Sequence, residues 1–249
     1  MNNTIKILNI DIQDITQSDL LKNLSEGVFV TPNVDHLVKL QKDREFYEVY
    51  QDADWVVCDS KVLSLGLRFL GTPIQEVIPG SSFFTEYYLY HKNNENVKIF
   101  LLGAAEGVAE KAMKNINNKV GWNMVVGAHS PSFGFEKNKT ECEEIIKKIN
   151  QTDAMVLLVG VGAPKQEKWI AKYKNQFTKV KLFMALGATI DFEAGNVKRA
   201  PKIFQTLALE WFFRMCVDPK RLIKRYLVDD MPFFFYLLKQ KLGFYKNPF

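Results

Sequence analysis

Short apolar runs rich in β-branched residues recur along the chain, and longer stretches with helical spacing of apolar residues separate them. This alternation constrains the fold most, because strands that are apolar throughout must be covered on both faces. We predict strands at residues 5–10, 28–31, 55–58, 97–102, 124–127, 155–160 and 182–186, and helices at 34–41, 61–70, 81–91, 107–117, 139–149 and 165–174. The predicted fold is therefore α/β: a Rossmann-like, mostly parallel sheet with helices on both faces.

The alternation stops near residue 197, and only helical patterns follow. Residues 198–249 contain eleven Lys or Arg and four Asp or Glu, a net charge of +7, whereas the whole chain carries +5. We therefore predict a Rossmann-like domain over residues 1–197 and a basic, helical C-terminal appendage over residues 198–249. Such an appendage favours a phosphorylated ligand, nucleic acid or an anionic lipid surface.

The cysteines and histidines form no metal-binding or redox pattern. Three of each are scattered along the chain, without a CxxC pair, so we expect idle thiols in a reducing compartment, no metal and no cofactor. No apolar run approaches the roughly 20 residues that span a bilayer. The N-terminus has no signal-peptide pattern, and these features together predict a cytoplasmic location.

Glycine or small polar residues follow five of the predicted strands, at 31–33, 59–60, 103–107, 160–165 and 187–191. Each one alone fits a simple turn. The carboxyl ends of parallel strands, however, meet at one edge of the sheet, where doubly wound folds bind their ligands. The five ends together predict a nucleotide-sized cleft.

Standard nucleotide motifs are missing from these strand ends. The dinucleotide fingerprint lacks its middle glycine between Gly103 and Gly107, and Gln166 stands where the loop after strand 155–160 needs a later glycine. The pair Asp52-x-Asp54 has the form of a metal-binding motif, but it precedes a strand, so we interpret it as a helix end and a solvated acid. A leaving diphosphate must then be neutralised by basic side chains.

The appendage contains a suitable basic cluster. Pro219 is predicted to begin a helix on which Arg221, Lys224 and Arg225 share one face, by their i, i+3 and i+4 spacing. A solvated charged face has the same pattern and stays the alternative. Residues 231–241 combine aromatic residues with lysines, which fits either an interfacial membrane segment or packing on the main domain or a sister subunit.

Six segments resemble the WecG/TagA/CpsF family of glycosyltransferases, glycosyltransferase family 26, over nearly the whole chain. They are TPNVDHL, ADWVVCD, IFLLGAAEGVAEKA, VGVGAPKQEKWI, ATIDFEAGNVKRAPK and LEWFFRMCVDPKRLIKRYL. The resemblance implies an inverting, metal-independent enzyme of bacterial cell-surface polysaccharide synthesis. It would transfer a sugar from a UDP-sugar to a lipid-diphosphate-linked saccharide, as a peripheral protein at the cytoplasmic face of the membrane, and it is compatible with a homo-oligomer.

The resemblance also implies roles for single residues. Asp59 takes the position of the catalytic base, which removes the proton of the acceptor hydroxyl; Thr31 is its polar neighbour, and Asn33 orients substrate or loop. The implied UDP-binding residues are Gln166 and Asp191 for uridine, Phe135 for stacking on uracil, Gly103 and Gly162 beside the nucleotide, and Arg214, Arg221 and Arg225 for the diphosphate.

Three positions depart from the family pattern. Ser60 stands for a glycine, Val77 for an arginine and Ser82 for an acid. These changes predict an altered sugar preference, and they keep open an inactive, scaffolding member of the family. The other alternative is a nucleotide- or nucleic-acid-binding module that uses the basic appendage, although no RNA-binding or helix-turn-helix motif is present and we expect no nucleic acid partner.

Overall fold

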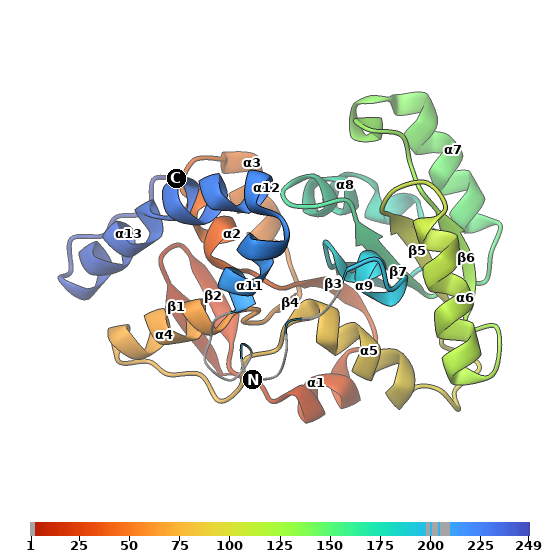
Figure 1. The fold of residues 1–249 in the computed structure, drawn as a ribbon, viewed down its shortest axis with the longest axis horizontal. Helices are drawn as coiled ribbons and strands as arrows, with labels where there is room; N and C mark the ends of the chain where they lie inside the picture. Colours follow the sequence, from red (N-terminus) through yellow and green to blue (C-terminus); the bar gives the residue numbers. More distant parts are fainter. Residues whose placement is uncertain (1–2, 198–199, 201–203, 205–209) are drawn as a thin grey trace.

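The structure is a computed structural model that describes residues 3–197, 200, 204 and 210–249, without the side chains of residues 210, 211, 214 and 221. In this part of the chain, six parallel strands form one sheet in the order β4-β3-β8-β7-β5-β6 (Figure 1). The strands are β3 (Gly27–Val30), β4 (Trp55–Val56), β5 (Ile99–Gly103), β6 (Val125–His129), β7 (Val156–Gly160) and β8 (Leu182–Ala185). The predicted parallel sheet is confirmed.

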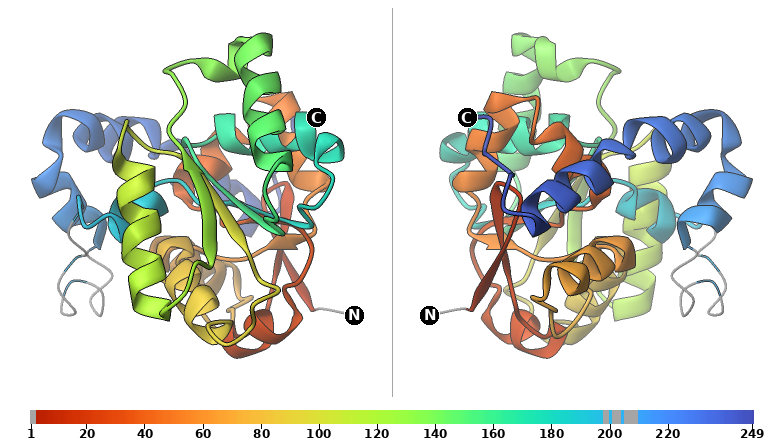
Figure 2. Two further views of the ribbon diagram at one scale, coloured as in Figure 1. Left: turned by 90° about the vertical axis from the view of Figure 1, so that its right-hand side faces the viewer. Right: turned by 90° about the vertical axis from the view of Figure 1, so that its left-hand side faces the viewer.

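Helices cover both faces of this sheet, as its apolar strands require (Figures 1 and 2). One apolar core contains side chains from α2 (Val34–Lys39), α3 (Arg44–Gln51), α4 (Lys61–Leu70), α7 (Lys139–Asn150), α8 (Lys165–Tyr173) and α13 (Pro232–Lys241). The other contains side chains from α1 (Gln17–Asn23), α5 (Gly80–Tyr90), α6 (Val108–Val120) and α9 (Thr189–Glu193). Strand residues alternate between the two cores: Val28 and Val30 lie in the first, and Phe29 in the second.

The prediction of one sheet strand at residues 5–10 is wrong. The chain instead makes an antiparallel hairpin of β1 (Thr4–Ile7) and β2 (Ile10–Gln13), separate from the main sheet. Leu8 and Asn9 form the turn, and Leu8 has a positive φ of 51°, which is uncommon for a leucine. Apolar residues on both sides of Asn9 conceal this turn in the sequence pattern.

The appendage continues as α11 (Glu210–Val217), α12 (Pro219–Lys224), a π-helix (Arg225–Asp229) and α13. Pro219 occupies the first turn of α12, which confirms the predicted helix start. The predicted division between residues 197 and 198 borders residues outside the described part and stays a prediction. Within the described residues, the structure contains no helix that is both long and apolar enough to cross a membrane.

One face of α13 packs on α4, at the left of Figure 1. Phe233 and Leu237 are buried there because Gly66 of α4 has no side chain: a Cβ at that position would lie 3.1 Å from the Phe233 ring and 3.3 Å from Leu237. Phe234 and Phe235 remain about half exposed. Packing on the main domain thus accounts for part of the aromatic run and leaves the rest on the surface.

Neighbouring strands approach one another unusually closely at the carboxyl edge of the sheet. A Cβ on Gly103, at the end of β5, would lie 2.5 Å from the carbonyl oxygen of Gly160 at the end of β7. A Cβ on Gly160 would in turn lie 2.7 Å from the carbonyl oxygen of Gly187, just after β8. Side chains cannot fit between these backbones, so the edge requires glycine at both strand ends.

We expect Gly103→Ala to lower the free energy of unfolding by about 2–4 kcal/mol, because the Cβ overlaps backbone and because φ is +138°. Urea unfolding measures the loss. Gly121→Ala is the matched control, since Gly121 has a φ of +86° but open space around its Cβ position; it should cost about 1 kcal/mol. Equal losses in the two variants would contradict the close-approach explanation.

Candidate active site

The loops after β3 and β4 lie side by side at the carboxyl edge of the sheet. The pairing of these strands continues beyond their ends, because Val57 N–H donates to Val30 O at 3.2 Å and Asp59 N–H donates to Pro32 O at 3.2 Å. Residues 31–33 and 59–60 are therefore neighbours, as the predicted topology requires.

Asp59 is a half-buried carboxylate that lies against the first turn of α5. Its Oδ1 accepts a hydrogen bond of 2.8 Å from Gly80 N–H, in the first turn of that helix, where the helix dipole favours negative charge. Thr31 is 7% exposed, and a Cβ on Gly80 would lie 2.9 Å from its Oγ1. The structure thus brings the predicted pair Asp59 and Thr31 together around Gly80, a residue that the sequence reasoning missed.

The three departures from the family pattern lie close to this pair in the chain. Ser60 caps α4, and its Oγ accepts from Leu63 N–H at 3.2 Å, so the serine has a structural role directly after Asp59. Ile78 N–H donates to Cys58 O at 2.8 Å, which holds the Val77 segment against the end of β4. Ser82 lies in the first turn of α5, two residues after Gly80.

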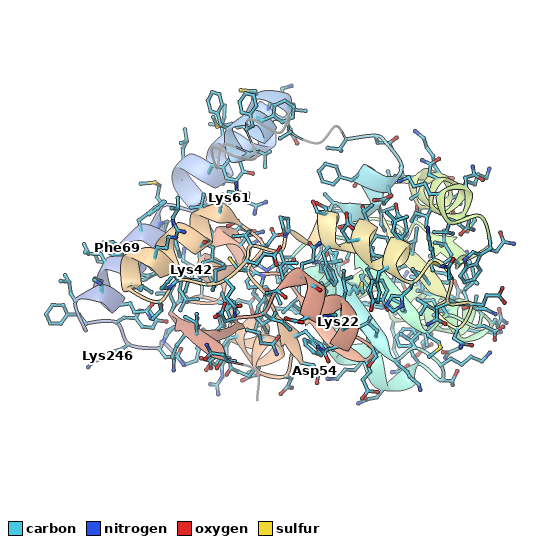
Figure 3. The ribbon with its side chains drawn as sticks, turned by 90° about the horizontal axis from the view of Figure 1, so that it is seen from below. Lys22, Lys42, Asp54, Lys61, Phe69 and Lys246 are labelled. Atoms are coloured by element: carbon cyan, nitrogen blue, oxygen red, sulfur yellow. The ribbon has the colours of Figure 1, made fainter. Side chains whose placement is uncertain are left out.

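The predicted Asp52-x-Asp54 pair lies at the other end of β4. Asp52 is the C-cap of α3, and exposed Asp54 accepts from Val28 N–H at 2.7 Å, before β4 begins. Lys61 follows β4 at its carboxyl end, and Figure 3 shows Asp54 and Lys61 well apart. The interpretation of this pair as a helix end and a surface acid fits this arrangement.

Asn33 connects the loop after β3 to the appendage. Its Oδ1 caps α2 by accepting from His36 N–H, and it also accepts from Arg225 Nη2; both distances are 3.3 Å. Arg225 is therefore brought to the predicted site. Arg214 and Arg221 lie in α11 and α12, but their side chains are outside the described part of the structure.

The loop after β7 is held together by the side chain of Gln166. This residue is 2% exposed; its Oε1 accepts from Gly162 N–H at 3.1 Å and its Nε2 donates to Glu167 Oε1 at 2.7 Å. Gly162 has a φ of +85°, and open space faces its Cβ position. Gln166 thus shapes the loop from within, and its predicted uridine contact stays a prediction.

Glu167 is a buried acid that the sequence reasoning missed. It is fully buried, and burial raises the pKa of its carboxyl from the ordinary 4.5 to about 7. Within the described residues, its Oε2 has no hydrogen-bond partner. Nearby, burial lowers the pKa of His36 to about 3, and its Nδ1 lies 2.6 Å from the Tyr50 hydroxyl. No sequence pattern distinguishes this buried glutamate from a surface one on a charged helix.

The two aromatic residues after β6 differ in exposure. Phe135, the predicted stacking residue, is 2% exposed and packs on Trp169, with ring centroids 5.9 Å apart. Phe133 is fully exposed, and Lys165 Nζ lies 5.2 Å from its ring centroid. A one-turn 3₁₀ helix at Phe135–Lys137 directs Phe135 into the core. Its ring is therefore unavailable for stacking, and Phe133 offers the accessible aromatic face.

A network around Glu193 fixes the helix that carries Asp191. The buried Glu193 carboxylate accepts from the Thr85 and Tyr88 hydroxyls at 2.6 and 2.9 Å and pairs with Lys119 Nζ at 2.8 Å. These partners come from α5 and α6, so the five-residue α9 is anchored on two longer helices. Asp191 is half-buried at the carboxyl end of β8.

The strand order therefore arranges the predicted residues along one edge. Asp59 follows β4, Thr31 and Asn33 follow β3, Asp191 follows β8, Gly162 and Gln166 follow β7, and Gly103 ends β5. The carboxylate of Asp59 lies at one end of this row, and the exposed ring of Phe133 follows the strand at the other end. Such an edge suits a polar group-transfer step beside a bound nucleotide.

Known proteins resemble the chain over nearly its whole length. A family model described as "Glycosyl transferase WecG/TagA/CpsF family" matches residues 5–247. A protein of Staphylococcus aureus strain MRSA252, named N-acetylglucosaminyldiphosphoundecaprenol N-acetyl-beta-D-mannosaminyltransferase, is 29% identical over 247 residues, 94% of this chain and 92% of the relative. A protein of the same name from strain NCTC 8325 / PS 47 is 28% identical over the same shares.

Glu167 should make the stability of the protein depend on pH. The pKa of its carboxyl is about 7 in the folded state and 4.5 in the unfolded chain, so the folded state binds the proton more tightly. The resulting contribution to stability is complete below pH 4.5 and is lost as the pH rises through 7. We expect Glu167→Gln to remove a decline of about 3 kcal/mol in the free energy of unfolding between pH 4.5 and 8. Urea unfolding across this range measures it. Parallel curves for wild type and variant would contradict the burial of a titrating acid; the exposed Glu143→Gln is the control.

Proposed function

The chain belongs to the glycosyl transferase WecG/TagA/CpsF family, and on this premise we propose that it transfers an N-acetylhexosaminyl group from a UDP-sugar to a lipid-diphosphate-linked saccharide. The S. aureus relatives are named for an N-acetyl-beta-D-mannosaminyl group and for N-acetylglucosaminyldiphosphoundecaprenol. The observation that carries the proposal is the meeting of Asp59, Thr31 and the N-terminus of α5 at the carboxyl edge. The product would belong to cell-surface polysaccharide synthesis.

In the proposed mechanism, Asp59 acts as the general base. Its carboxylate takes the proton of the acceptor hydroxyl while that oxygen bonds to the anomeric carbon of the donor. The bond from this carbon to the UDP oxygen breaks, and UDP leaves with the electron pair. Attack opposite the leaving group inverts the anomeric configuration. Gly80 N–H supports the role because it fixes Asp59 Oδ1, and Thr31 provides a polar neighbour.

The UDP part of the donor would occupy the ends of β8, β7, β5 and β6. Phe133 supports this assignment, because its exposed ring beside the Lys165 ammonium can stack on uracil. Gly162 presents open space at the same loop, and Asp191 is suited to accept from ribose hydroxyls. A uracil stacked on Phe133 is our replacement for the sequence-based assignment to Phe135.

The diphosphate would be neutralised by the appendage without a metal. We assign this role to Arg214 and Arg221, as the family resemblance implies, together with Lys224, which is exposed at the end of α12. Arg225 is already engaged by Asn33 and by acidic side chains, so we assign it a different role below. Basic side chains offset the charge that develops on the leaving UDP.

Sugar selection would involve the residues around Gly80. Val77 and Ser82 lie on either side of this glycine in the chain, and its N–H binds the proposed base. Since Val77 replaces an arginine and Ser82 an acid of the family pattern, two charged groups that could read sugar substituents are absent from these positions. We therefore propose a sugar preference that differs from that of typical family members, with charged donors such as uronic acids disfavoured.

The lipid-linked acceptor would hold the enzyme at the cytoplasmic face of a membrane as a peripheral protein. The exposed Phe234, Phe235 and Leu238 of α13 support this location, because an apolar helix face next to Lys239 and Lys241 suits a lipid interface. Co-sedimentation of the protein with anionic liposomes measures the location directly.

We expect Asp59→Asn to lower kcat by at least about 100-fold, because the amide cannot accept the hydroxyl proton, whereas UDP should still raise the Tm without added metal. The assay follows transfer from a panel of UDP-sugars to lipid-diphosphate N-acetylglucosamine. Phe133→Ala is the complementary variant, which should weaken the UDP-induced Tm shift. Full activity of Asp59→Asn would rule out the base assignment. Binding of UDP without transfer from any donor would instead support a scaffolding protein.

A further inference from the structure

The carboxylate of Asp35 is shared by two cations from different parts of the chain. Lys39 Nζ lies 2.7 Å from Asp35 Oδ2, one turn along α2, and Arg225 Nη2 lies 3.5 Å from the same oxygen. The Asp35 side chain is 13% exposed, and those of Lys39 and Arg225 are 36% and 29% exposed. One oxygen thus pairs with both cations, and partial burial strengthens these pairs relative to surface ion pairs.

The two cations contact different segments of the proposed site. Lys39 Nζ also donates to the carbonyl oxygen of Ala163 at 3.2 Å, within the loop after β7. The same loop contains the bond from Gly162 N–H to Gln166. Arg225 begins the π-helix of the appendage and also donates to Asn33 in the loop after β3. Asp35 is thus the link between the loop after β7 and the appendage, which are far apart in sequence.

Asp230 explains why Arg225 stays at this position. Its side chain is 8% exposed, and its Oδ2 lies 3.9 Å from Arg225 Nε. Burial raises the pKa of Asp230 to about 6, and the charge of Arg225 opposes this rise. Moving Arg225 away to a substrate would leave Asp35 with Lys39 alone and would remove the cation beside the buried Asp230, which is costly. Arg225 therefore acts as a polar attachment of the appendage, beside the apolar packing of α13 on α4.

We propose that Asp35 is a positioning residue that couples the attachment of the appendage to the conformation of the loop after β7. The proposal rests on the proposed function in one respect: the loop and the appendage are assigned to uridine and diphosphate of one donor. If they are coupled, binding at one favours the bound arrangement of the other, by reciprocity of linked equilibria. Asp35, Lys39 and Arg225 then serve donor binding without touching the reacting atoms.

Hydrogen exchange in a double-mutant cycle tests this coupling on the full chain. Exchange is followed by mass spectrometry in peptides that cover residues 161–166 and 225–241, in the absence of any ligand. The variants are Arg225→Met, Asp35→Asn and the double variant. We expect Arg225→Met to raise exchange in both peptides, by about threefold in the loop. In the Asp35→Asn background, the same change should affect residues 225–241 only.

Lys39→Met is a second route to the same test, should Asp35→Asn fold poorly. It removes the link to Ala163, so Arg225→Met should then leave the loop unaffected. Glu48→Gln is the matched control, because Glu48 forms an exposed i, i+4 pair with Arg44 on neighbouring α3, and it should change neither peptide. A Tm close to that of the wild type confirms that each variant is folded.

The proposal is overturned if Arg225→Met leaves residues 161–166 unchanged, or if it raises their exchange equally with and without Asp35. A donor KM that rises in Asp35→Asn while kcat changes little is also expected, since positioning affects binding first. Failure of the proposed function is distinguishable: coupled exchange together with no UDP-induced Tm shift would reject UDP as ligand and leave the coupling intact. A UDP-induced shift with uncoupled exchange would reject the role of Asp35 alone.

Discussion

The parallel pairing of the six strands is the constraint on which the rest of the site depends. Because all strands run in one direction, every loop that follows a strand emerges at the same edge, and residues separated by more than a hundred positions become neighbours. The pairing extends beyond β3 and β4 through the bond from Asp59 N–H to Pro32 O, so the register of the sheet itself sets the position of the proposed base. At β5 and β7 the strands approach so closely that only glycine fits.

The fold could be predicted from the sequence because apolar strand patterns alternate regularly with amphipathic helix patterns. Strands that are apolar throughout require helices on both faces of the sheet. The prediction failed at residues 5–10, where the chain turns at Leu8 and Asn9, because a single asparagine among apolar residues is a weak turn signal. The direction of side chains in loops could not be predicted from the sequence either. Phe133 and Phe135 are two residues apart, and only the 3₁₀ turn decides that Phe135 is buried. The contact between Asn33 and Arg225 depends on tertiary structure alone.

Buried acids hold the loops of the site in two different ways. Both carboxylate oxygens of Glu193 are hydrogen-bonded, with Thr85, Tyr88 and Lys119 as donors, and this network anchors the short helix that contains Asp191. Glu167 instead orients Gln166 with one oxygen, while burial raises the pKa of its carboxyl to about 7. Each of these acids determines the position of a segment that we assign to the nucleotide. The attachment of the appendage through Arg225 adds a third such support, from outside the sheet.

The central claim is a single displacement in which Asp59 activates the acceptor and UDP leaves from the opposite side of the sugar. The most direct test is the anomeric configuration of the product, determined by NMR after transfer from an α-linked UDP-N-acetylhexosamine to a lipid-diphosphate acceptor. The account predicts a β-linked product, formed with inversion. An α-linked product would contradict it, because retention requires a covalent intermediate or a different course of attack, and neither follows from one carboxylate at this position.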